Sequence, residues 1–355
     1  MPADSLRILL VMDAFIKVPP DHYGGIERVV ADVADRFAAA GHEVTLWAAP
    51  GSRVNGRTVP FGREGEWTRW SNVRNTLTLA GRFLGPMRFD VIHNFGRLAY
   101  LAPVLARDVP KVQTDMRAVD PGNMATARRL GARRLHYTAV SAAIADTGHP
   151  GGGDWSVIYN CAVPARYRFA GATDPRTAPL VFLGRLDRIK GVHHAITVAQ
   201  RLRRRLIVAG NISPLAHEQD YFEREVRPRF DGELVSYIGP VGDAAKQELL
   251  GHAAAMLMPI EWEEPFPVVL PESMLCGTPL IAFRRGGVPE GIDHSRTGFL
   301  CDTVDEMTAL VARLPEIDRA AVRAEAERRF SDTAIAADYE QLYRRLGASG
   351  GAHRR

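Results

Sequence analysis

The stretch EPFPVVLPE, Glu264 to Glu272, decides how the rest of the chain is interpreted. It follows an apolar run at Ala255–Pro259 that is typical of a buried strand, and it precedes the small-residue turn at Cys276–Thr278. As a loop that enters a helix, the stretch places Glu264 before the helix and Glu272 about a turn and a half along it. Both carboxylates can then face one cavity, at different parts of a ligand.

A polyhydroxylated ligand suits this pair of carboxylates. Ionised carboxylates accept hydrogen bonds from hydroxyl groups, and a helix N-terminus favours negative charge. A sugar at one glutamate, a ribose at the other and phosphate between them is chemically consistent. The spacing alone also fits a helix that carries acidic residues in its first turns only because they favour its dipole.

The motif GRLDRIKG, Gly184 to Gly191, follows the first strand predicted for the second half of the chain. Arg185 and Lys190 lie at the strand's end and at the entry to the next helix, where a diphosphate would meet a guanidinium, an ammonium and helix amides. An arginine and a lysine beside a turn are also common on a solvated surface. Six strands, each separated by a helix-length segment, predict a parallel sheet covered on both faces: Leu180–Leu183, Leu206–Ala209, Leu234–Ile238, Ala255–Met258, Leu280–Phe283 and Phe299–Cys301.

The first half predicts a second α/β domain. A βαβ unit runs from a buried strand through a helix that begins at Gly24-Gly25, where bare backbone would let an anion approach or where close packing requires glycine. His93 lies at a strand's carboxyl end, a position that serves either ligand binding or structure. Residues 51–85 are expected to be an irregular helix-and-loop region. The predicted strands are Arg7–Met12, His42–Ala48, Phe89–His93, Lys111–Thr114, Tyr137–Val140 and Trp155–Tyr159.

Composition excludes several classes of protein. The chain has 355 residues, 46% of them hydrophobic and 24% charged, which fits two soluble domains. No apolar run approaches the length of a membrane span, and Leu6–Met12 lacks the flanks of a signal peptide, so a cytoplasmic protein is expected. The three cysteines, Cys161, Cys276 and Cys301, are neither paired nor in CxxC spacing, which argues against disulfides and a cysteine-based zinc site.

Charge and motifs narrow the ligand class further. The net charge of +4 suits an anionic substrate and leaves weak contact with an anionic membrane surface open, but the arginine clusters lack the interleaved aromatics of nucleic-acid binders. No GxGxxG follows the first strand and no GxxxxGK[ST] occurs anywhere, so neither a dinucleotide fingerprint nor a P-loop is present.

Taken together, these motifs resemble the retaining family 4 glycosyltransferases of GT-B fold. The resemblance covers nearly the whole chain, and its last segment is the most specific. Within the family, the chain is most similar to the bacterial subgroup described as UDP-glucose:tetrahydrobiopterin glucosyltransferase-like. The motifs that carry the resemblance are YGGIERVV (Tyr23–Val30), DVIHN (Asp90–Asn94), VIYN (Val157–Asn160), FLGRLDRIKG (Phe182–Gly191), VSYIGPV (Val235–Val241) and EWEEPFPVVLPESMLCGTPLIAFRRGGVPE (Glu261–Glu290).

The resemblance implies two Rossmann-like domains with parallel sheets that face a central cleft. Residues 1–165 would form the acceptor-side domain, completed by a C-terminal helix at 331–347, and residues 166–330 would hold the nucleotide sugar. Residues 348–355 would be a disordered tail. No metal and no other cofactor would be needed, in agreement with the absence of a DxD motif. The acceptor, whether a glycan, a lipid-linked sugar or a small molecule, is left open.

Site roles follow by position from the same resemblance. Arg185 and Lys190 would bind the donor diphosphate, Glu272 the ribose, and Glu264 the sugar. The full donor-binding set implied is Gly24, Gly25, Gly184, Arg185, Lys190, Gly239, Val241, Glu264, Phe266, Val268 and Glu272.

One departure concerns the reaction centre. Family members commonly carry a histidine in a TxH pattern after a strand, where this chain has Thr114-Asp115-Met116. Asp115 or His93 would then substitute for the histidine, or the donor or acceptor differs from the family's norm. As the substitute, Asp115 would join Glu264, Arg185 and Lys190 as a catalytic residue by stabilising developing positive charge, with His93 and Met116 on the acceptor side. Because side chains alternate along a strand, Asp115 reaches the site only if the chain has left strand geometry by Thr114.

Two other departures are prolines, at Pro267 and Pro271, where the family usually has glycine and a helix former. Two alternative functions stay open with them: a catalytically weak nucleotide-sugar-binding protein, and a GT-B nucleotide-sugar epimerase.

Overall fold

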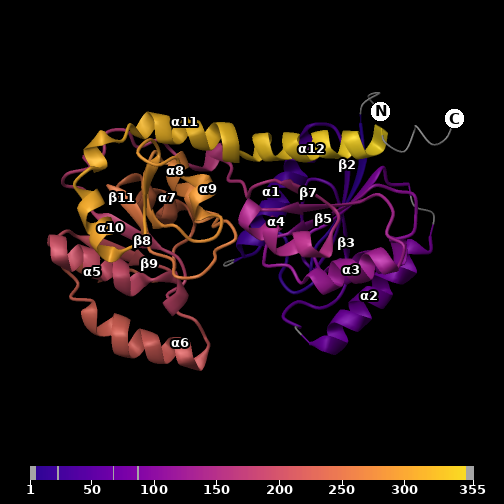
Figure 1. The fold of residues 1–355 in the computed structure, drawn as a ribbon, viewed down its shortest axis with the longest axis horizontal. Coiled ribbons are helices and arrows are strands. Elements are labelled where there is room, and N and C mark those ends of the chain that lie inside the picture. Colours follow the sequence, from indigo (N-terminus) through magenta and orange to yellow (C-terminus); the bar gives the residue numbers. More distant parts are fainter. Residues whose placement is uncertain (1–4, 22–23, 67, 86–87, 349–355) are drawn as a thin grey trace. The chain divides into compact units, whose positions relative to one another are not determined.

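The computed structural model describes residues 5–21, 24–66, 68–85 and 88–348, which form two α/β units (Figure 1). Unit 1 comprises Met1–Cys161 with Asp332–Arg355, and unit 2 comprises Ala162–Ser331. The chain therefore leaves unit 1 near the division predicted at residues 165 and 166 and returns to it with the C-terminal helix. Of the predicted disordered tail, 348–355, only Ala348 belongs to the described residues, as the last residue of a helix.

Unit 1 is built on a seven-stranded parallel sheet in the order β3-β2-β1-β4-β5-β6-β7. Its central strands are short and almost fully buried, as parallel sheets covered on both faces require, although two of them, Val91–Asn94 and Lys111–Asp115, also carry polar side chains. The strand order reverses between β1 and β4, so the carboxyl ends of these two strands mark the switch point. The strands are β1 (Arg7–Val11), β2 (Glu43–Ala48), β3 (Arg57–Pro60), β4 (Val91–Asn94), β5 (Lys111–Asp115), β6 (Leu135–Ala139) and β7 (Asp154–Val157).

Residues 51–85 are more regular than expected, because they hold β3 and α2. The buried face of helix α2 is half polar, with Ser71 and Asn75 beside Leu79 and Phe83. The helix begins at a capping box in which Thr68 and Ser71 exchange hydrogen bonds with each other's backbone. The helices of unit 1 are α1 (Gly25–Ala39), α2 (Arg69–Phe83), α3 (Pro121–Arg129), α4 (Ala142–Gly148) and α12 (Asp332–Ala348), with short 3₁₀ turns at Leu98–Val104 and His149–Gly151.

The C-terminal helix α12 packs beside α1 on unit 1, where Figure 1 draws it in yellow. Arg36 of α1 holds its first residue, Asp332, through an ion pair of 2.6 Å. Its buried stripe is formed by Ile335, Tyr339, Leu342 and Tyr343. Leu346, the last residue of the predicted stripe, is only half-buried.

Unit 2 contains a six-stranded parallel sheet in the order β10-β9-β8-β11-β12-β13, which reverses between β8 and β11. All six strands were predicted, and four of them keep both predicted ends. The strands are β8 (Leu180–Leu183), β9 (Leu206–Ala209), β10 (Val235–Tyr237), β11 (Ala255–Met258), β12 (Leu280–Phe283) and β13 (Gly298–Cys301).

Helices cover both faces of this sheet, as the helix-length gaps between the strands predict. The main helices are α5 (Val192–Leu202), α6 (Ala216–Tyr221), α7 (Asp243–Gly251), α8 (Val269–Leu275), α9 (Val288–Gly291), α10 (Val304–Val311) and α11 (Arg319–Phe330). A π-helical segment at Phe222–Val226 continues α6, and 3₁₀ turns lie at Pro164–Arg166, Arg188–Lys190, Arg227–Arg229 and Leu314–Glu316.

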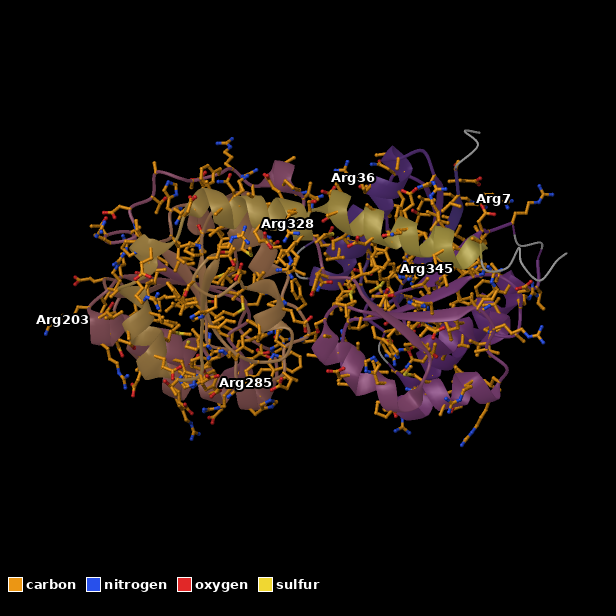
Figure 2. The ribbon with its side chains drawn as sticks, turned by 45° about the horizontal axis from the view of Figure 1, so that its top comes forward. Arg7, Arg36, Arg203, Arg285, Arg328 and Arg345 are labelled. Atoms are coloured by element: carbon orange, nitrogen blue, oxygen red, sulfur yellow. The ribbon has the colours of Figure 1, made fainter. Side chains whose placement is uncertain are left out.

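The arginines are distributed over many elements. Figure 2 labels examples from each unit: Arg7 in β1, Arg36 in α1 and Arg345 in α12, and Arg203 after α5, Arg285 after β12 and Arg328 in α11. Several of them form ion pairs with acidic residues of the same unit, as Arg7 does with Asp90 at 2.7 Å and Arg328 with Glu325 at 2.6 Å. Within the described residues, no helix is long and apolar enough to cross a membrane.

His93 binds the sheet of unit 1 to α12. Its side chain has no exposed surface, and its two ring nitrogens contact the hydroxyl groups of Tyr343 and Thr114. Burial lowers the pKa of His93 well below its ordinary value, so the ring is neutral. A neutral imidazole has one donor and one acceptor, and the two hydroxyls satisfy both.

Removal of the Tyr343 hydroxyl should therefore destabilise unit 1. Tyr343→Phe leaves one buried nitrogen of His93 without its partner, which costs about 1–3 kcal/mol. Gln341→Ala, at an exposed position of the same helix, is the matched control and should change stability by less than about 0.5 kcal/mol. Urea unfolding followed by circular dichroism measures both; equal stability of the two variants would contradict the role given to the hydroxyl.

Candidate active site

The two loops that the sequence singled out meet at the switch point of unit 2. Strands β8 and β11 are hydrogen-bonded neighbours, and the loops that leave their carboxyl ends are Gly184–Gly191 and 259–268. In open α/β sheets this is where ligands bind. The amide of Glu261 donates to the carbonyl of Ile189 at 2.9 Å, so the loops are joined through their backbones as well.

Lys190 and Glu264 form an ion pair across these two loops. The side chains are 18% and 10% exposed, so the pair is largely removed from water. The indole nitrogen of Trp262 donates to the same carboxylate oxygen at 2.5 Å, and the Lys190 ammonium lies 5.3 Å from the centre of that ring. Lys190, predicted to bind the diphosphate, and Glu264, predicted to bind the sugar, are thus in direct contact.

Arg185 lies in the same β8 loop and is ion-paired with Asp187. Asp187 is almost fully buried, and this desolvation raises its pKa, while the charge of Arg185 opposes the rise. The Arg185 side chain is 38% exposed, so its guanidinium stays accessible at the edge where an anion would bind.

Glu272 belongs to a separate network. It lies in the first turns of α8, only 3% exposed, where it accepts a hydrogen bond from the Tyr167 hydroxyl at 2.8 Å and pairs with the Lys246 ammonium. Lys246 also lies 5.7 Å from the centre of the Tyr167 ring. The two predicted carboxylates therefore have different cationic partners, Lys190 for one and Lys246 for the other.

The prolines of this segment are accommodated. Pro271 is the third residue of α8, within the first turn. The N–H groups of a helix's first turn have no carbonyl partner within the helix, so a proline there loses no helical hydrogen bond. The amides on either side still bond, from Leu270 to the Pro267 carbonyl at 3.0 Å and from Glu272 to the Val268 carbonyl at 3.3 Å.

The loop after β12 holds the backbone of the Glu264 loop through hydrogen bonds. The Gly287 amide donates to the Glu264 carbonyl at 2.7 Å, and the Gly286 amide donates to the Glu263 carboxylate at 2.6 Å. Gly286 has φ of 54°, and a Cβ at this position would lie 2.2 Å from the Glu264 carbonyl oxygen. Only glycine allows this approach.

The other residues of the predicted donor set in unit 2 lie around the same edge. Phe266 is 2% exposed and its ring centre lies 5.3 Å from that of Phe330, so its side chain belongs to the core and only its backbone can face a ligand. Val268 caps α8, and Val241 is half-buried in the loop between β10 and α7. Gly239 accepts from Gly210 at 3.0 Å, and a Cβ on Gly210 would lie 1.7 Å from the carbonyl oxygen of Gly184.

In unit 1, Gly24 caps α1 and Gly25 begins it. A Cβ on Gly24 would lie 2.8 Å from the Pro20 Cβ and 2.9 Å from a Glu27 carboxylate oxygen, which gives this glycine a packing reason. Tyr23, the first residue of the motif, lies outside the described residues.

The remaining unit 1 residues do not take the positions that the sequence suggested. His93 is enclosed by Tyr343 and Thr114 and offers no exposed atom to an acceptor. Strand β5 continues through Asp115, so the condition set for that carboxylate is not met: Asp115 points to the face opposite Thr114, where the Gln113 amide contacts it at 3.3 Å. Met116 is 8% exposed.

Several polar residues at these edges were not singled out from the sequence. In unit 2 they are Trp262, Tyr167 and Lys246. In unit 1 they are Asp13 and Glu27, two carboxyls whose pKa is raised by burial at the end of β1 and in the first turn of α1. The position of Asp13 directly after the first strand was a usable signal, whereas Tyr167 and Lys246 are far from Glu272 in sequence.

Comparison with known proteins agrees with this geometry. The family described as Glycosyltransferase Family 4 matches residues 23–166, and the family described as Glycosyl transferases group 1 matches residues 165–334. The solved structure of AviGT4, a glycosyltransferase involved in avilamycin A biosynthesis, is 30% identical, has a TM-score of 0.70, and aligns over 97% of this chain and 98% of that chain.

Other similar proteins are more distant in sequence, and two of them are solved structures with the same fold. The glycogen synthase of Mycobacterium tuberculosis is 28% identical over 83% of this chain and 82% of that enzyme. The sucrose-phosphate synthase of Thermosynechococcus elongatus is 19% identical, with a TM-score of 0.77 over 97% of this chain and 100% of that chain. Anabaena HepE, solved with UDP and glucose, is 19% identical, with a TM-score of 0.72 over 95% of this chain and 99% of that chain.

Two parallel-sheet Rossmann-like domains with these neighbours define the GT-B class of glycosyltransferases. The chain belongs to the glycosyltransferase family whose N-terminal part is described as Family 4 and whose C-terminal part is described as group 1.

The glycine beneath Glu264 gives a direct test of the site's architecture. Gly286→Ala places a methyl group against backbone, which must shift the Glu264 loop, and it strains a positive φ; we expect a loss of about 1–3 kcal/mol and a clear loss of ligand affinity. The control is Gly242→Ala in the same unit, where φ is −80° and a Cβ meets nothing within 4 Å. Thermal unfolding and calorimetry with UDP check both; wild-type behaviour of Gly286→Ala would show that the loop position is unimportant.

Asp115 should make the stability of unit 1 depend on pH. Burial raises the pKa of Asp115 from 3.8 to about 7, so the folded state holds its proton more tightly than the unfolded chain does. Its stabilising contribution is complete below about pH 4 and is lost as the pH rises through about 7.

Asp115→Asn should flatten this dependence and be more stable than wild type at pH 8, by up to roughly 4 kcal/mol. Denaturant unfolding between pH 4.5 and 8.5 measures the effect, with the exposed Asp154→Asn as control. Parallel pH profiles of wild type and Asp115→Asn would contradict the assignment.

Proposed function

We propose that this protein is a retaining hexosyltransferase that uses a nucleotide-diphosphate sugar, with a UDP-sugar favoured, and binds the diphosphate without a metal ion. The observation that carries the proposal is the Lys190–Glu264 pair at the switch point of unit 2, with Arg185 on the same loop. It offers cations for a diphosphate and a carboxylate for sugar hydroxyls within one small region.

Each group has a separate task in this proposal. Arg185 and Lys190 stabilise the charge on the departing diphosphate, and Glu264, held by Trp262, accepts hydrogen bonds from the sugar. Glu272, held by Tyr167, accepts hydrogen bonds from the ribose. The bond between sugar C1 and the diphosphate oxygen breaks, and the diphosphate leaves with the electron pair. An acceptor hydroxyl oxygen bonds to C1 on the same face and gives its proton to the departing diphosphate oxygen.

The choice of UDP draws on relatives and on motif resemblance. HepE has been solved with UDP and with UDP-glucose, and the motifs resemble the UDP-glucose:tetrahydrobiopterin glucosyltransferase-like subgroup. The acceptor, a glycan, a lipid-linked sugar or a small molecule, would bind unit 1. Asp13 and Glu27 are the unit 1 carboxyls best placed for it, at the carboxyl end of β1 and the start of α1.

A cytoplasmic location, with weak attraction to an anionic membrane surface, is part of the same proposal. The attraction to the membrane surface rests on the net charge of +4.

The roles of the charged residues can be separated by calorimetry with UDP and by a transfer or donor-hydrolysis assay, both in EDTA. Glu272→Ala should weaken UDP binding. Glu264→Ala should spare UDP and lower the transfer rate. Lys190→Ala should lower kcat by about 10²–10³, as loss of a preorganised charge stabiliser does. Glu248→Ala, at an exposed position of α7, is the control.

Three results would contradict the proposal: loss of wild-type UDP binding in EDTA, an unchanged rate in Lys190→Ala, or equal losses of UDP affinity in both glutamate variants. Absence of multiple turnovers would instead support a nucleotide-sugar-binding protein. Conversion of the donor alone to an epimer, seen by NMR, would support an epimerase.

A further inference from the structure

Within the described part of the chain, one group of three metal-ligating side chains lies beside the donor loops and has no part in the proposed transfer. It consists of His193 and His194, at the start of α5, and Glu261, in the loop after β11. One ligand atom from each residue lies within 4.8 Å of the others. Two imidazoles and one carboxylate are a common ligand set for divalent transition metals.

The distances come close to those of a metal site. The Nε2 atom of His194 is 3.0 Å from a Glu261 carboxylate oxygen, and Nε2 of His193 is 4.0 Å from the same oxygen. Zinc bonds of about 2.0–2.1 Å in a tetrahedral site place ligand atoms about 3.3 Å apart. Small side-chain rotations suffice, because Glu261 is 39% exposed at its side chain and the histidines are 17% and 25% exposed.

Neighbouring groups orient the histidine rings. Nδ1 of His193 contacts the Tyr221 hydroxyl at 2.7 Å, which leaves Nε2 toward Glu261. When Nδ1 carries the proton and donates to the tyrosine oxygen, the Nε2 lone pair is available to a metal, as in most histidine ligands. The His194 ring lies 4.0 Å from the His193 ring and 5.6 Å from the Phe283 ring, centre to centre.

Other charges around the cluster are already compensated. The Arg188 guanidinium stacks on the ring of Tyr221, the residue that contacts Nδ1 of His193, at 4.5 Å from the ring centre. Arg188 also forms an ion pair with Glu225. Arg229 donates to the backbone carbonyl of His193 at 2.9 Å. Glu261 is therefore the carboxylate that balances a cation bound between the two rings.

We propose that Nε2 of His193, Nε2 of His194 and the Glu261 carboxylate bind one divalent transition-metal ion, with zinc as the probe and an open fourth position for water. The two histidines are adjacent in sequence, but their carboxylate partner is far along the chain and meets them only because β8 and β11 are neighbours. The site is separate from the diphosphate cations Arg185 and Lys190.

The consequence for the enzyme concerns the loop after β11. Glu261 precedes Trp262, whose indole holds Glu264, and its own amide bonds to Ile189 beside Lys190. A metal on Glu261 would fix this loop against α5 and so change affinity for the donor. This consequence rests on the proposed function, whereas metal binding itself does not.

Metal binding is tested with the full chain, freed of metal by chelation and without nucleotide. Zinc calorimetry and the visible absorption of Co²⁺ should show one ion per chain in wild type. His193→Ala and His194→Ala should each weaken binding by about 100-fold or more. Tyr221→Phe, which removes only the orienting hydroxyl, should weaken it by about 10–100-fold.

The matched control is the pair His217→Ala and His252→Ala, exposed histidines of the same unit, which should bind as wild type does. Circular dichroism and thermal unfolding without metal establish that each variant is folded. Zinc should raise the melting temperature of wild type and of the two control variants, but not that of His193→Ala or His194→Ala. Absence of binding in wild type, or undiminished binding in the His193→Ala and His194→Ala variants, would overturn the proposal.

The coupling to the donor is measured separately, as the UDP dissociation constant with and without zinc. We expect a change of at least about threefold in wild type and none in His194→Ala. An unchanged constant in a protein that binds zinc would overturn the coupling and leave the metal site standing. Failure of UDP binding altogether would count against the proposed function alone.

Discussion

The ion pair between Lys190 and Glu264 depends on a single topological fact, the adjacency of β8 and β11 in the sheet of unit 2. Parallel strands deliver their carboxyl-end loops to one edge, so residues far apart in sequence are brought within hydrogen-bonding distance. With 18% and 10% exposure, the two side chains are largely removed from water, and each charge is compensated by the other. In the proposed function, a diphosphate and a sugar replace this mutual pairing with contacts of the same kinds.

Glycines make the approach of the loops possible. A Cβ on Gly191, which has φ of 75°, would lie 1.9 Å from the Pro259 carbonyl oxygen, and one on Gly286 would collide with Glu264. Backbone therefore packs on backbone on two sides of the loop after β11, and the carboxylate of Glu264 is positioned by the main chain as much as by Trp262. A side chain held in this way loses little freedom when a ligand binds.

The sequence predicted the strands of unit 2 well because buried parallel strands are short, continuous apolar runs that glycine-rich turns interrupt. It predicted Arg185, Lys190, Glu264 and Glu272 as one group because their motifs follow strands. It predicted only an irregular helix-and-loop region where α2 lies, because the buried face of that helix includes the polar residues Ser71 and Asn75. It could not predict the partners of Glu272, since Tyr167 and Lys246 reach it only through tertiary packing. The acceptor-side role predicted for His93 did not account for the covering helix. A side chain near the end of a strand can point toward that helix, as His93 does toward Tyr343 of α12, as readily as toward the ligand-binding edge of the sheet.

Hydrogen exchange measured by mass spectrometry on the full chain, with and without saturating UDP in EDTA, tests the central claim most directly, because it asks where the nucleotide binds without assuming any residue's role. The account predicts increased protection in peptides that cover Gly184–Gly191 and residues 259–275, the two loops joined by Lys190 and Glu264 and the helix that carries Glu272. Protection confined to other segments, with these loops unchanged at saturation, would contradict it.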